Sequence, residues 1–160
     1  MKLVGYFILL YCFFAEVNNH ATGNVFMLSV VIITKNEAHI IGNTLQSLQG
    51  VSDDIVIVDS GSTDETIAIC KQFNATVIQT GWDGYGANKN KGIDVARHDW
   101  ILSLDADEAI DTELRAVLQN LSPADETVVY KLSYSNFFCN KHIRFGVWGI
   151  DRHIRLFNRK

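Results

Sequence analysis

Asp105 and Asp107 are separated by one residue and directly follow the apolar residues 100–104. Two carboxylates with this spacing at the end of a strand can contact one hard cation together. Mg²⁺ and Mn²⁺ prefer oxygen ligands and commonly share them between protein carboxylates and substrate phosphates. The alternative is a strand-end turn with two solvated carboxylates. The position after an apolar strand favours a site for a cation and a diphosphate.

Asp59 is a second candidate, because it ends the apolar residues 54–59. Gly61 permits a tight turn after it, and residues 62–65 have the pattern of a helix-capping box. We expect the polar side chains of that box to cap the helix that follows. Asp59 has no expected capping role, so its carboxylate is free to accept an N–H group from a base such as uracil.

Two further segments carry polar candidates. Thr34 and Glu37 flank the loop after the first apolar run, beside the expected position of a base, and Asn36 is the expected cap of the next helix. Lys89 and Lys91 lie in a later segment from which a lysine can meet a diphosphate. For Lys91 we favour an ordinary solvated helix face.

The elements that must position these residues alternate along the chain. The hydrophobic patterns predict strands over residues 29–34, 54–59, 75–79 and 100–104, with helices over 37–48, 62–73 and 87–96. This order predicts an α/β fold with a parallel sheet and helices on both faces. Ligands of such sheets bind at the carboxyl ends of the strands, where the candidate residues fall. A helix over 111–120 and strands over 128–134 and 153–157 are expected to follow.

Composition excludes several classes of protein. The 160 residues are 48% hydrophobic and 20% charged, which is typical of one globular domain, and the net charge of −4 gives no support for nucleic-acid binding. The glycines of residues 81–86 lack the dinucleotide-binding spacing, so we exclude NAD binding. The three cysteines have no metal-binding spacing and are expected to be free thiols. A basic cluster near the carboxyl end is expected to be a solvated face or a contact for an anion; it comprises Lys141, Arg144, Arg152, Arg155, Arg159 and Lys160.

The first 26 residues contain a short apolar stretch, residues 3–15, followed by a polar stretch. Three alternatives remain open: a signal or anchor, a start assigned too early with Met27 as the true start, and a short helix packed on the domain. We favour the second alternative, because the expected domain begins with the strand after Met27.

Four segments, in this order, resemble family 2 glycosyltransferases of the GT-A fold: residues 29–37, 59–66, 88–92 and 100–108. They look like the family's opening strand, its second-strand motif, its Ala-Arg-Asn-x-Gly segment with Lys89 in place of arginine, and its Asp-x-Asp strand. The resemblance implies a Rossmann-like, mostly parallel sheet. Residues 137–157 look like the lipopolysaccharide-core glucosyltransferase-like branch. The family's domain normally runs past residue 160, so we expect residues 27–160 to hold the donor half and the start of the acceptor half of a C-terminally truncated domain.

The resemblance also implies roles for the matching residues. Asp59 would bind the uracil of a UDP-sugar, with Thr34 and Glu37 lining the base pocket. Lys89 would hold the nucleotide. Asp105 would contact the ribose or the metal, and Asp107 would be the main protein ligand of Mg²⁺ or Mn²⁺. The catalytic base is not assigned by the motifs, and Asp151 is a weak candidate for it.

The expected function is therefore a metal-dependent inverting glycosyltransferase. It would move a sugar from a UDP-sugar to a glycan or lipid-linked acceptor in cell-envelope polysaccharide or lipopolysaccharide synthesis. Two alternatives are a non-catalytic nucleotide-sugar-binding fragment and a metal-dependent nucleotidyltransferase. The expected location is the cytoplasm, with peripheral association at the inner face of the cell membrane, because donor and lipid-linked acceptor meet there.

Overall fold

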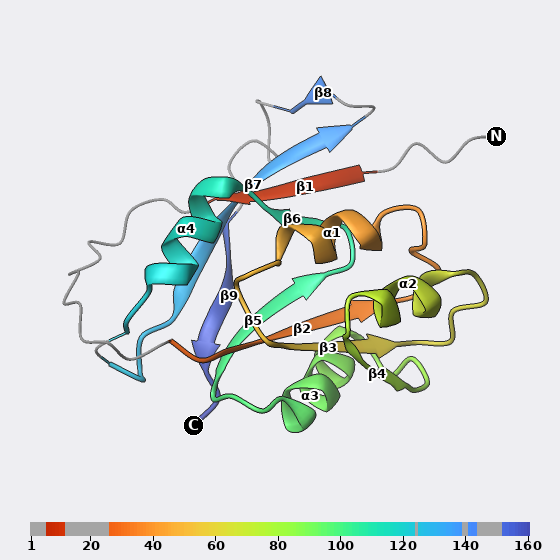
Figure 1. Ribbon diagram of the computed structural model, residues 1–160, viewed down its shortest axis with the longest axis horizontal. Coiled ribbons are helices and arrows are strands. Elements are labelled where there is room, and N and C mark those ends of the chain that lie inside the picture. The colour runs from red at the N-terminus through yellow and green to blue at the C-terminus, as the bar shows by residue number, and fades with distance from the viewer. Residues whose placement is uncertain (1–5, 12–25, 124, 139–140, 144–151) are drawn as a thin grey trace.

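The computed structural model describes residues 6–11, 26–123, 125–138, 141–143 and 152–160. Within these residues the chain forms one mixed sheet with the strand order β4-β3-β2-β5-β9-β7-β1-β6, and β8 pairs with β7 (Figure 1). The strands are β1 (Tyr6–Tyr11), β2 (Leu28–Thr34), β3 (Asp54–Asp59), β4 (Thr76–Gln79), β5 (Trp100–Asp105), β6 (Glu108–Ile110), β7 (Tyr130–Phe138), β8 (Lys141–His142) and β9 (Arg152–Asn158). The helices are α1 (Ile41–Ser47), α2 (Thr66–Gln72), α3 (Tyr85–Val95) and α4 (Thr112–Asn120).

The strands from β4 to β5 are parallel, as their continuous apolar sequences predict. Their register aligns the carboxyl ends. Thr34 of β2 is paired with Asp59 of β3, and Ile33 is paired with Asp105 of β5. The expected α/β architecture is confirmed, and its parallel part carries the predicted site residues on one edge. Next to β5 in the sheet, strands β9 and β7 run antiparallel to their neighbours.

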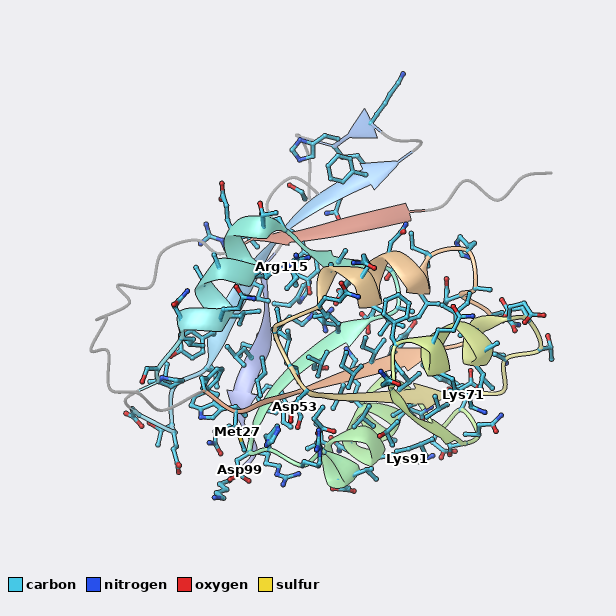
Figure 2. All side chains as sticks on the ribbon, in the orientation of Figure 1. Met27, Asp53, Lys71, Lys91, Asp99 and Arg115 are labelled. Atoms are coloured by element: carbon cyan, nitrogen blue, oxygen red, sulfur yellow. The ribbon has the colours of Figure 1, made fainter. Side chains whose placement is uncertain are left out.

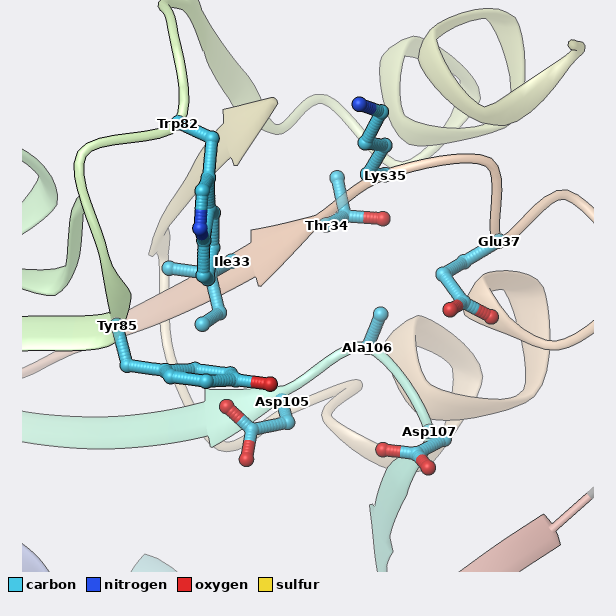
Figure 3. Close-up of a pocket in the computed structure, with 9 residues that line it drawn as sticks. All are labelled: Ile33, Thr34, Lys35, Glu37, Trp82, Tyr85, Asp105, Ala106 and Asp107. Carbon is cyan, nitrogen blue, oxygen red and sulfur yellow. The ribbon is translucent and has the colours of Figure 1, made fainter. Parts of the chain in front are cut away.

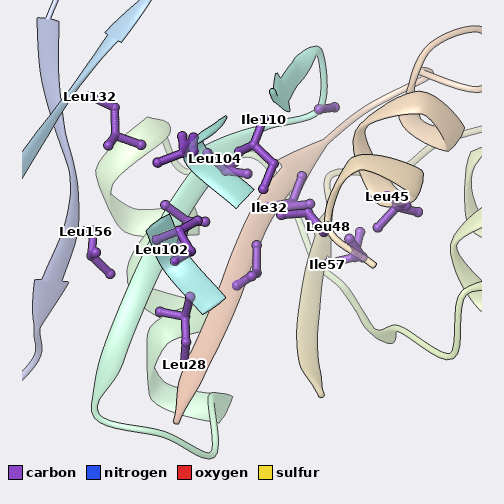
Figure 4. Packing of buried hydrophobic residues seen from close by; sticks show 14 of the residues in the cluster. Leu28, Ile32, Leu45, Leu48, Ile57, Leu102, Leu104, Ile110, Leu132 and Leu156 are labelled. Atoms are coloured by element: carbon purple, nitrogen blue, oxygen red, sulfur yellow. The ribbon is translucent and has the colours of Figure 1, made fainter. Parts of the chain in front are cut away.

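Alternate residues of each strand face opposite sides of the sheet, and both sides are covered by helices. On one side Val30, Ile32 and Leu102 pack in a core with residues of α1, α2 and α4 (Figure 4). On the other side Val31 and Val58 pack in a smaller core with Ala96, which directly follows α3, and Ile93 of α3 packs against it. The prediction of helices on both faces is therefore confirmed.

Helix α3 lies unusually close to the sheet at Gly92. A Cβ atom at this position would be 2.4 Å from Cγ1 of Val31 and 2.8 Å from Cγ2 of Val58. Only glycine avoids these overlaps. Gly92 therefore sets the distance between β2, β3 and the helix that carries Lys89.

The loops after β2 and β3 hold one another, which differs from the predicted helix caps. The backbone N–H of Asn36 donates to the Ser62 hydroxyl, and that of Ala38 donates to the Asp64 carboxylate. The Asn36 side chain in turn accepts from the backbone N–H of Thr63. The residues directly before α1 and α2 make no side-chain cap, so the predicted capping role of residue 36 is wrong. Of the box, Asp64 accepts the backbone N–H of Thr66, the first residue of α2, at 3.1 Å. Both helices begin about four residues later than predicted, at 41 and 66, because the preceding residues are used in these loop contacts.

Helix α4 lies within the predicted helix 111–120, and it is preceded by one strand that was not predicted. Asp111 caps α4, since its carboxylate accepts from the backbone N–H of Leu114 at 2.7 Å. The short strand β6 was not predicted, because its three residues follow the Asp-x-Asp segment directly and show no separate pattern.

The apolar amino-terminal segment contributes a strand. Residues 6–11 form β1, which pairs antiparallel with β7 and parallel with β6. The sequence left three alternatives for this segment: a signal or anchor, a start assigned too early, and a packed helix. In the structure, residues 6–11 have the backbone conformation of a strand and not of a helix. The division at residue 26 stays a prediction. Among the described residues, none of the helices has the length and apolar character needed to cross a membrane.

The edge formed by the amino ends of the parallel strands is closed by ion pairs. Figure 2 shows Asp53 and Asp99 at this edge, near the start of β3 and β5. Asp99 pairs with Lys160 at 2.6 Å, and Asp53 pairs with Arg97 at 3.4 Å. The basic cluster of the carboxyl end is thus divided, because Lys160 and Arg159 bind Asp99 while Arg155 lies elsewhere. Cys70 is free and buried, as expected, whereas Cys12, Cys139 and Arg144 lie outside the described residues.

Candidate donor site

A cavity of about 570 Å³ lies at the carboxyl ends of β2 and β5 (Figure 3). Four of the predicted site residues contribute to its wall, which comes from three separate loops. The lining residues are Ile33, Thr34, Lys35, Glu37, Trp82, Tyr85, Asp105, Ala106 and Asp107. The parallel register has therefore collected residues that are far apart in sequence at one edge.

Asp59 lies in the strand beside Thr34 and is completely buried, so it does not line the cavity. Its Oδ2 accepts the backbone N–H groups of Gly61 and Ser62 at 3.0 and 2.9 Å. Asp59 therefore caps no helix, as predicted, but this oxygen holds the turn before α2 and is not free for a ligand. Its Oδ1 and the Oγ1 of Thr34 are buried and have no hydrogen-bond partner among the described residues. Unpaired buried acceptors are rare, so these two atoms mark the place where a polar ligand group fits.

Glu37 is the carboxylate at the far side of the cavity from Trp82 (Figure 3). Its backbone N–H donates to the Thr66 hydroxyl at 2.8 Å, which fixes the loop. Burial raises the pKa of the Glu37 carboxyl, His39 lowers it, and Asp107 raises it again. The charge of Asp107 therefore reaches Glu37 across the cavity.

Asp105 is held by two cations. The ammonium nitrogen of Lys89 lies 2.9 Å from its Oδ1, and a guanidinium nitrogen of Arg155 lies 3.1 Å from its Oδ2. Its backbone N–H donates to the carboxylate of Glu108 at 2.9 Å. Both carboxylate oxygens of Asp105 therefore lie within ion-pair distance of a protein cation, although Oδ1 has no partner with hydrogen-bond geometry among the described residues.

Asp107 differs from Asp105 because its carboxylate has no ion pair or hydrogen bond to a side chain of the described residues. Burial raises the pKa of Asp107, and Asp105 raises it further, while Arg155 and His39 lower it. An open carboxylate at the wall of a cavity suits a hard cation that receives its other oxygens from phosphates and water. Among the described residues there is no group of three or more His, Cys, Asp or Glu side chains placed to hold a metal ion. The residues thus fit a cation shared with a diphosphate and not a closed protein cage.

Trp82 and Tyr85 were not identified from the sequence. Both contact the cavity, their rings meet edge to face with centroids 4.9 Å apart, and they remain 51% and 69% exposed. Large exposed aromatic faces beside a polar hollow are typical of ligand contacts. Their Trp-x-x-Tyr spacing within the glycine segment was the available signal.

Asn88 fixes the loop that carries these aromatic residues. It is fully buried, its amide donates to the Ser60 hydroxyl at 2.8 Å, and its carbonyl oxygen accepts the backbone N–H of Asp83. Lys91 is not directed at the cavity, because it pairs with Asp83 at 2.5 Å. It is therefore part of an ion pair and not only the solvated helix face that we favoured.

Comparison with known proteins gives the family. A model of the family described as Glycosyl transferase family 2 matches residues 29–159, which is most of the chain. The chain belongs to glycosyl transferase family 2. This confirms the expected resemblance, and the sheet described above agrees with the GT-A architecture expected for it.

Several curated relatives are also named as glycosyltransferases. An uncharacterized glycosyltransferase of Rickettsia felis is 43% identical over 88 residues, which cover 55% of this chain and 31% of that protein. One of Rickettsia typhi is 30% identical over 136 residues, covering 83% of this chain and 47% of that protein. The matches therefore span between about a third and a half of these relatives.

Two further comparisons concern a named pathway enzyme and a solved structure. A lipopolysaccharide core biosynthesis glycosyltransferase, LpsC of Rhizobium meliloti, is 35% identical over 111 residues, covering 64% of this chain and 39% of that protein. This match supports the expected resemblance to the lipopolysaccharide-core branch. The crystal structure of residues 1–349 of TarS from S. aureus is 30% identical, with a TM-score of 0.49 over 56% of this chain and 30% of that chain.

One predicted residue of this family 2 domain cannot be placed. Asp151, the weak candidate for the catalytic base, lies outside the described residues, as do Phe145 and Trp148. The described site therefore consists of groups that suit a donor nucleotide, and the base of the transfer reaction stays unassigned.

Proposed function

We propose that this chain forms the donor site of a glycosyltransferase that uses a UDP-sugar and a divalent cation. The observation that carries the proposal is the arrangement of one sheet edge. Two buried polar atoms without a hydrogen-bond partner among the described residues, Asp59 Oδ1 and Thr34 Oγ1, lie at the carboxyl ends of β3 and β2. The open carboxylate of Asp107 follows β5 at the same edge. The first pair suits a nucleobase, and the carboxylate suits the cation on a diphosphate.

The base end of the site is built for a donor N–H group. Uracil presents such a group at N3, and an aspartate oxygen is an acceptor only, so Asp59 Oδ1 is the matching partner. Thr34 lines the cavity on the neighbouring strand. Trp82 supplies an apolar face for a planar ring at the same end.

The diphosphate end combines positive charge with an open ligand. Lys89 and Asp105 form an ion pair at the cavity, so the ammonium group is already held where phosphate oxygens would lie. Asp107 would hold Mg²⁺ or Mn²⁺ together with those oxygens. When bound, the cation supplies Lewis acidity that stabilises the leaving UDP. Lys89 adds a fixed positive charge to the same group.

The acceptor is proposed from relatives only. LpsC is named for lipopolysaccharide core biosynthesis, and on this similarity we propose a glycan or lipid-linked acceptor of the cell envelope. Inverting transfer needs a base that removes the proton of the acceptor hydroxyl. We propose a location at the inner face of the membrane, where such acceptors meet nucleotide-sugars.

The decisive experiment compares UDP and CDP binding to the chain and to Asp59→Asn by calorimetry with Mn²⁺. In the variant the amide oxygen can still accept the N–H groups of Gly61 and Ser62, while the amide nitrogen replaces the free acceptor with a donor. We expect UDP affinity to fall by about 10- to 100-fold because two donors then face each other. Cytosine has an acceptor at N3, so the ratio of CDP to UDP affinity should rise.

Two results would count against the proposal. A wild-type chain that melts cooperatively and binds no UDP with Mn²⁺ would exclude the donor site. An Asp59→Asn variant with the wild-type preference for UDP would exclude the role of Asp59. Asp125→Asn is the matched control, since that carboxylate also accepts a backbone N–H group, that of Thr127, and does not line the cavity.

A further inference from the structure

We propose that Arg155 is a positioning residue of the donor site, which holds Asp105 and Glu108 together and so leaves Asp107 open to the cation. This inference rests on the proposed function. Arg155 lies 50 residues after Asp105 in the sequence and does not line the cavity. Its effect on the cavity is therefore indirect, through its contact with Asp105, which does line it. It was expected to be only one member of a basic cluster at the carboxyl end.

The guanidinium group of Arg155 contacts three partners. One nitrogen lies 3.1 Å from Oδ2 of Asp105 and also contacts Oε1 of Glu108. The Nε–H donates to the hydroxyl of Tyr134. Arginine suits this arrangement because its donors lie in a rigid plane, whereas lysine offers a single point charge.

Arg155 is one of two cations, with Lys89, that contact the carboxylates of this loop. Asp105, Asp107 and Glu108 carry three carboxylates within four residues. Glu108 is 2% exposed and receives only one backbone N–H, that of Asp105, among the described contacts. Lys89 reaches Asp105 but is not paired with Glu108. The side chain of Arg155 is 13% exposed and is the cation described at both Asp105 and Glu108.

A break in the strand register aims Arg155 at this loop. Tyr130 of β7 is paired with Leu156 of β9, whereas Lys131 is paired with Ile154. Residue 155 is thus the extra residue on β9 at this irregularity. A bulge of this kind rotates a side chain away from the regular alternation and is common beside functional sites. Leu156 can therefore stay in the core while Arg155 turns to the charged loop.

As a consequence, Asp105 and Asp107 have different roles. Asp105 is occupied by Lys89 and Arg155 and serves as an anchor for both cations. Glu108, held by Arg155, accepts the backbone N–H of Asp105 and fixes the turn between them. Asp107, which lies inside this turn, is left with a carboxylate directed to the cavity (Figure 3).

The test compares Arg155→Met with the wild-type chain by two measurements. Hydrogen–deuterium exchange of the peptide covering residues 104–110 in the free protein reports the loop. Calorimetry with UDP and Mn²⁺ reports the site. We expect exchange in this peptide to rise by about tenfold or more and UDP affinity to fall by about 10- to 100-fold, which is typical when a partner of a metal ligand is lost. Arg155→Lys should lie between the two proteins in both measurements.

Further variants keep the result decisive. Arg155→Met with Glu108→Gln removes the buried carboxylate together with its cation, so this double variant should fold even if the single variant does not. It should still bind UDP more weakly. Arg159→Met is the matched control, because Arg159 binds Asp99 and the carbonyls of Ile93 and Ala96 at the opposite edge. It should lower the melting temperature without changing either measurement.

The outcomes separate this inference from the proposed function. Wild-type loop exchange and wild-type UDP affinity in the double variant would overturn it, because Arg155 would then only neutralise a buried charge. A wild-type chain without UDP binding would refute the proposed function. In that case faster exchange confined to residues 104–110 in the Arg155→Met variant would still support positioning, and unchanged exchange would refute it.

Discussion

The ammonium nitrogen of Lys89 lies 2.9 Å from Oδ1 of Asp105, so an ion pair joins α3 to the end of β5. The two residues were assigned to the site separately, one for the nucleotide and the other for ribose or metal. Their contact shows that Asp105 also holds the cation that we propose for the diphosphate. This relationship leaves Asp107 as the carboxylate available for a metal.

Substitution of Asp107 by asparagine should abolish the effect of Mn²⁺ on UDP binding. The amide keeps the size of the side chain but loses the charge that a hard cation requires. We expect UDP affinity in Mn²⁺ to fall by at least about tenfold, which is about 1.4 kcal/mol. Calorimetry with and without Mn²⁺ measures this difference, and circular dichroism checks the fold. Asp99→Asn, at the opposite edge, is the control and should bind UDP normally. Unchanged Mn²⁺ dependence in Asp107→Asn would refute the assignment.

As pH is lowered, Mn²⁺-dependent UDP binding should be lost at a higher pH than it would be if Asp107 had the usual pKa of an aspartate. Burial, followed by the charge of Asp105, raises the pKa of the Asp107 carboxyl, and a protonated carboxyl does not bind a cation. Affinity should therefore fall as pH is lowered through this raised pKa. A titration of affinity from neutral to acidic pH measures the midpoint. A midpoint at or below the usual aspartate pKa of about 3.9 would contradict the prediction.

The stability of the ligand-free protein should show opposite pH effects for two aspartates. Because the pKa of Asp107 is raised in the folded protein, this carboxyl binds more protons in the folded than in the unfolded state. Its contribution to the free energy of unfolding therefore falls as pH rises. Asp107→Asn should accordingly be more stable than wild type at neutral pH. Burial would raise the pKa of Asp54, but hydrogen bonds from Ser29 and Arg97 lower it. Asp54 therefore stabilises the fold at neutral pH, and this contribution is lost as pH falls through its folded pKa. Asp54→Asn should accordingly be less stable at neutral pH. Denaturant unfolding at several pH values measures both differences, which should shrink in acid.

Replacement of Gly92 by alanine should destabilise the domain. The new Cβ would lie 2.4 and 2.8 Å from side-chain carbons of Val31 and Val58, so α3 must move away from the sheet. The expected cost is about 1–3 kcal/mol, seen as a lower denaturant midpoint. Gly86→Ala is the matched control in the same helix, since its Cβ meets no atom within 4 Å. That change should increase stability by about 0.5–1 kcal/mol. Equal effects of the two substitutions would contradict the close packing at Gly92.

Binding of UDP should quench the fluorescence of Trp82. This indole is 51% exposed and lines the cavity, whereas that of Trp100 is buried in the core. A base stacked on Trp82 would change its emission and leave that of Trp100 unaltered. Titration of the wild-type chain and of Trp82→Leu with UDP and Mn²⁺ measures the difference. Quenching that persists in Trp82→Leu would place the base away from this residue.

The sequence alone determined the parallel half of the fold and the residues at its edge. Apolar runs and helical periods are local patterns, and the crossover order makes the strands β4 to β5 parallel. Once they are parallel, their carboxyl ends must meet, which is why Thr34, Asp105 and Asp107 share one cavity. The same reasoning failed for the helix starts, because hydrogen bonds between the two loops compete with local capping.

Only the tertiary structure decided what each of these residues does. The antiparallel pairing of β5 with β9 and the register break at residue 155 bring Arg155 to Asp105 across 50 residues of sequence. That contact distinguishes the anchored Asp105 from the open Asp107. The position of Trp82 likewise depends on hydrogen bonds that Asn88 donates to Ser60 of another loop and to the carbonyl of Gly81 beside Trp82. Such contacts depend on register and packing between distant strands, and local sequence patterns do not encode them.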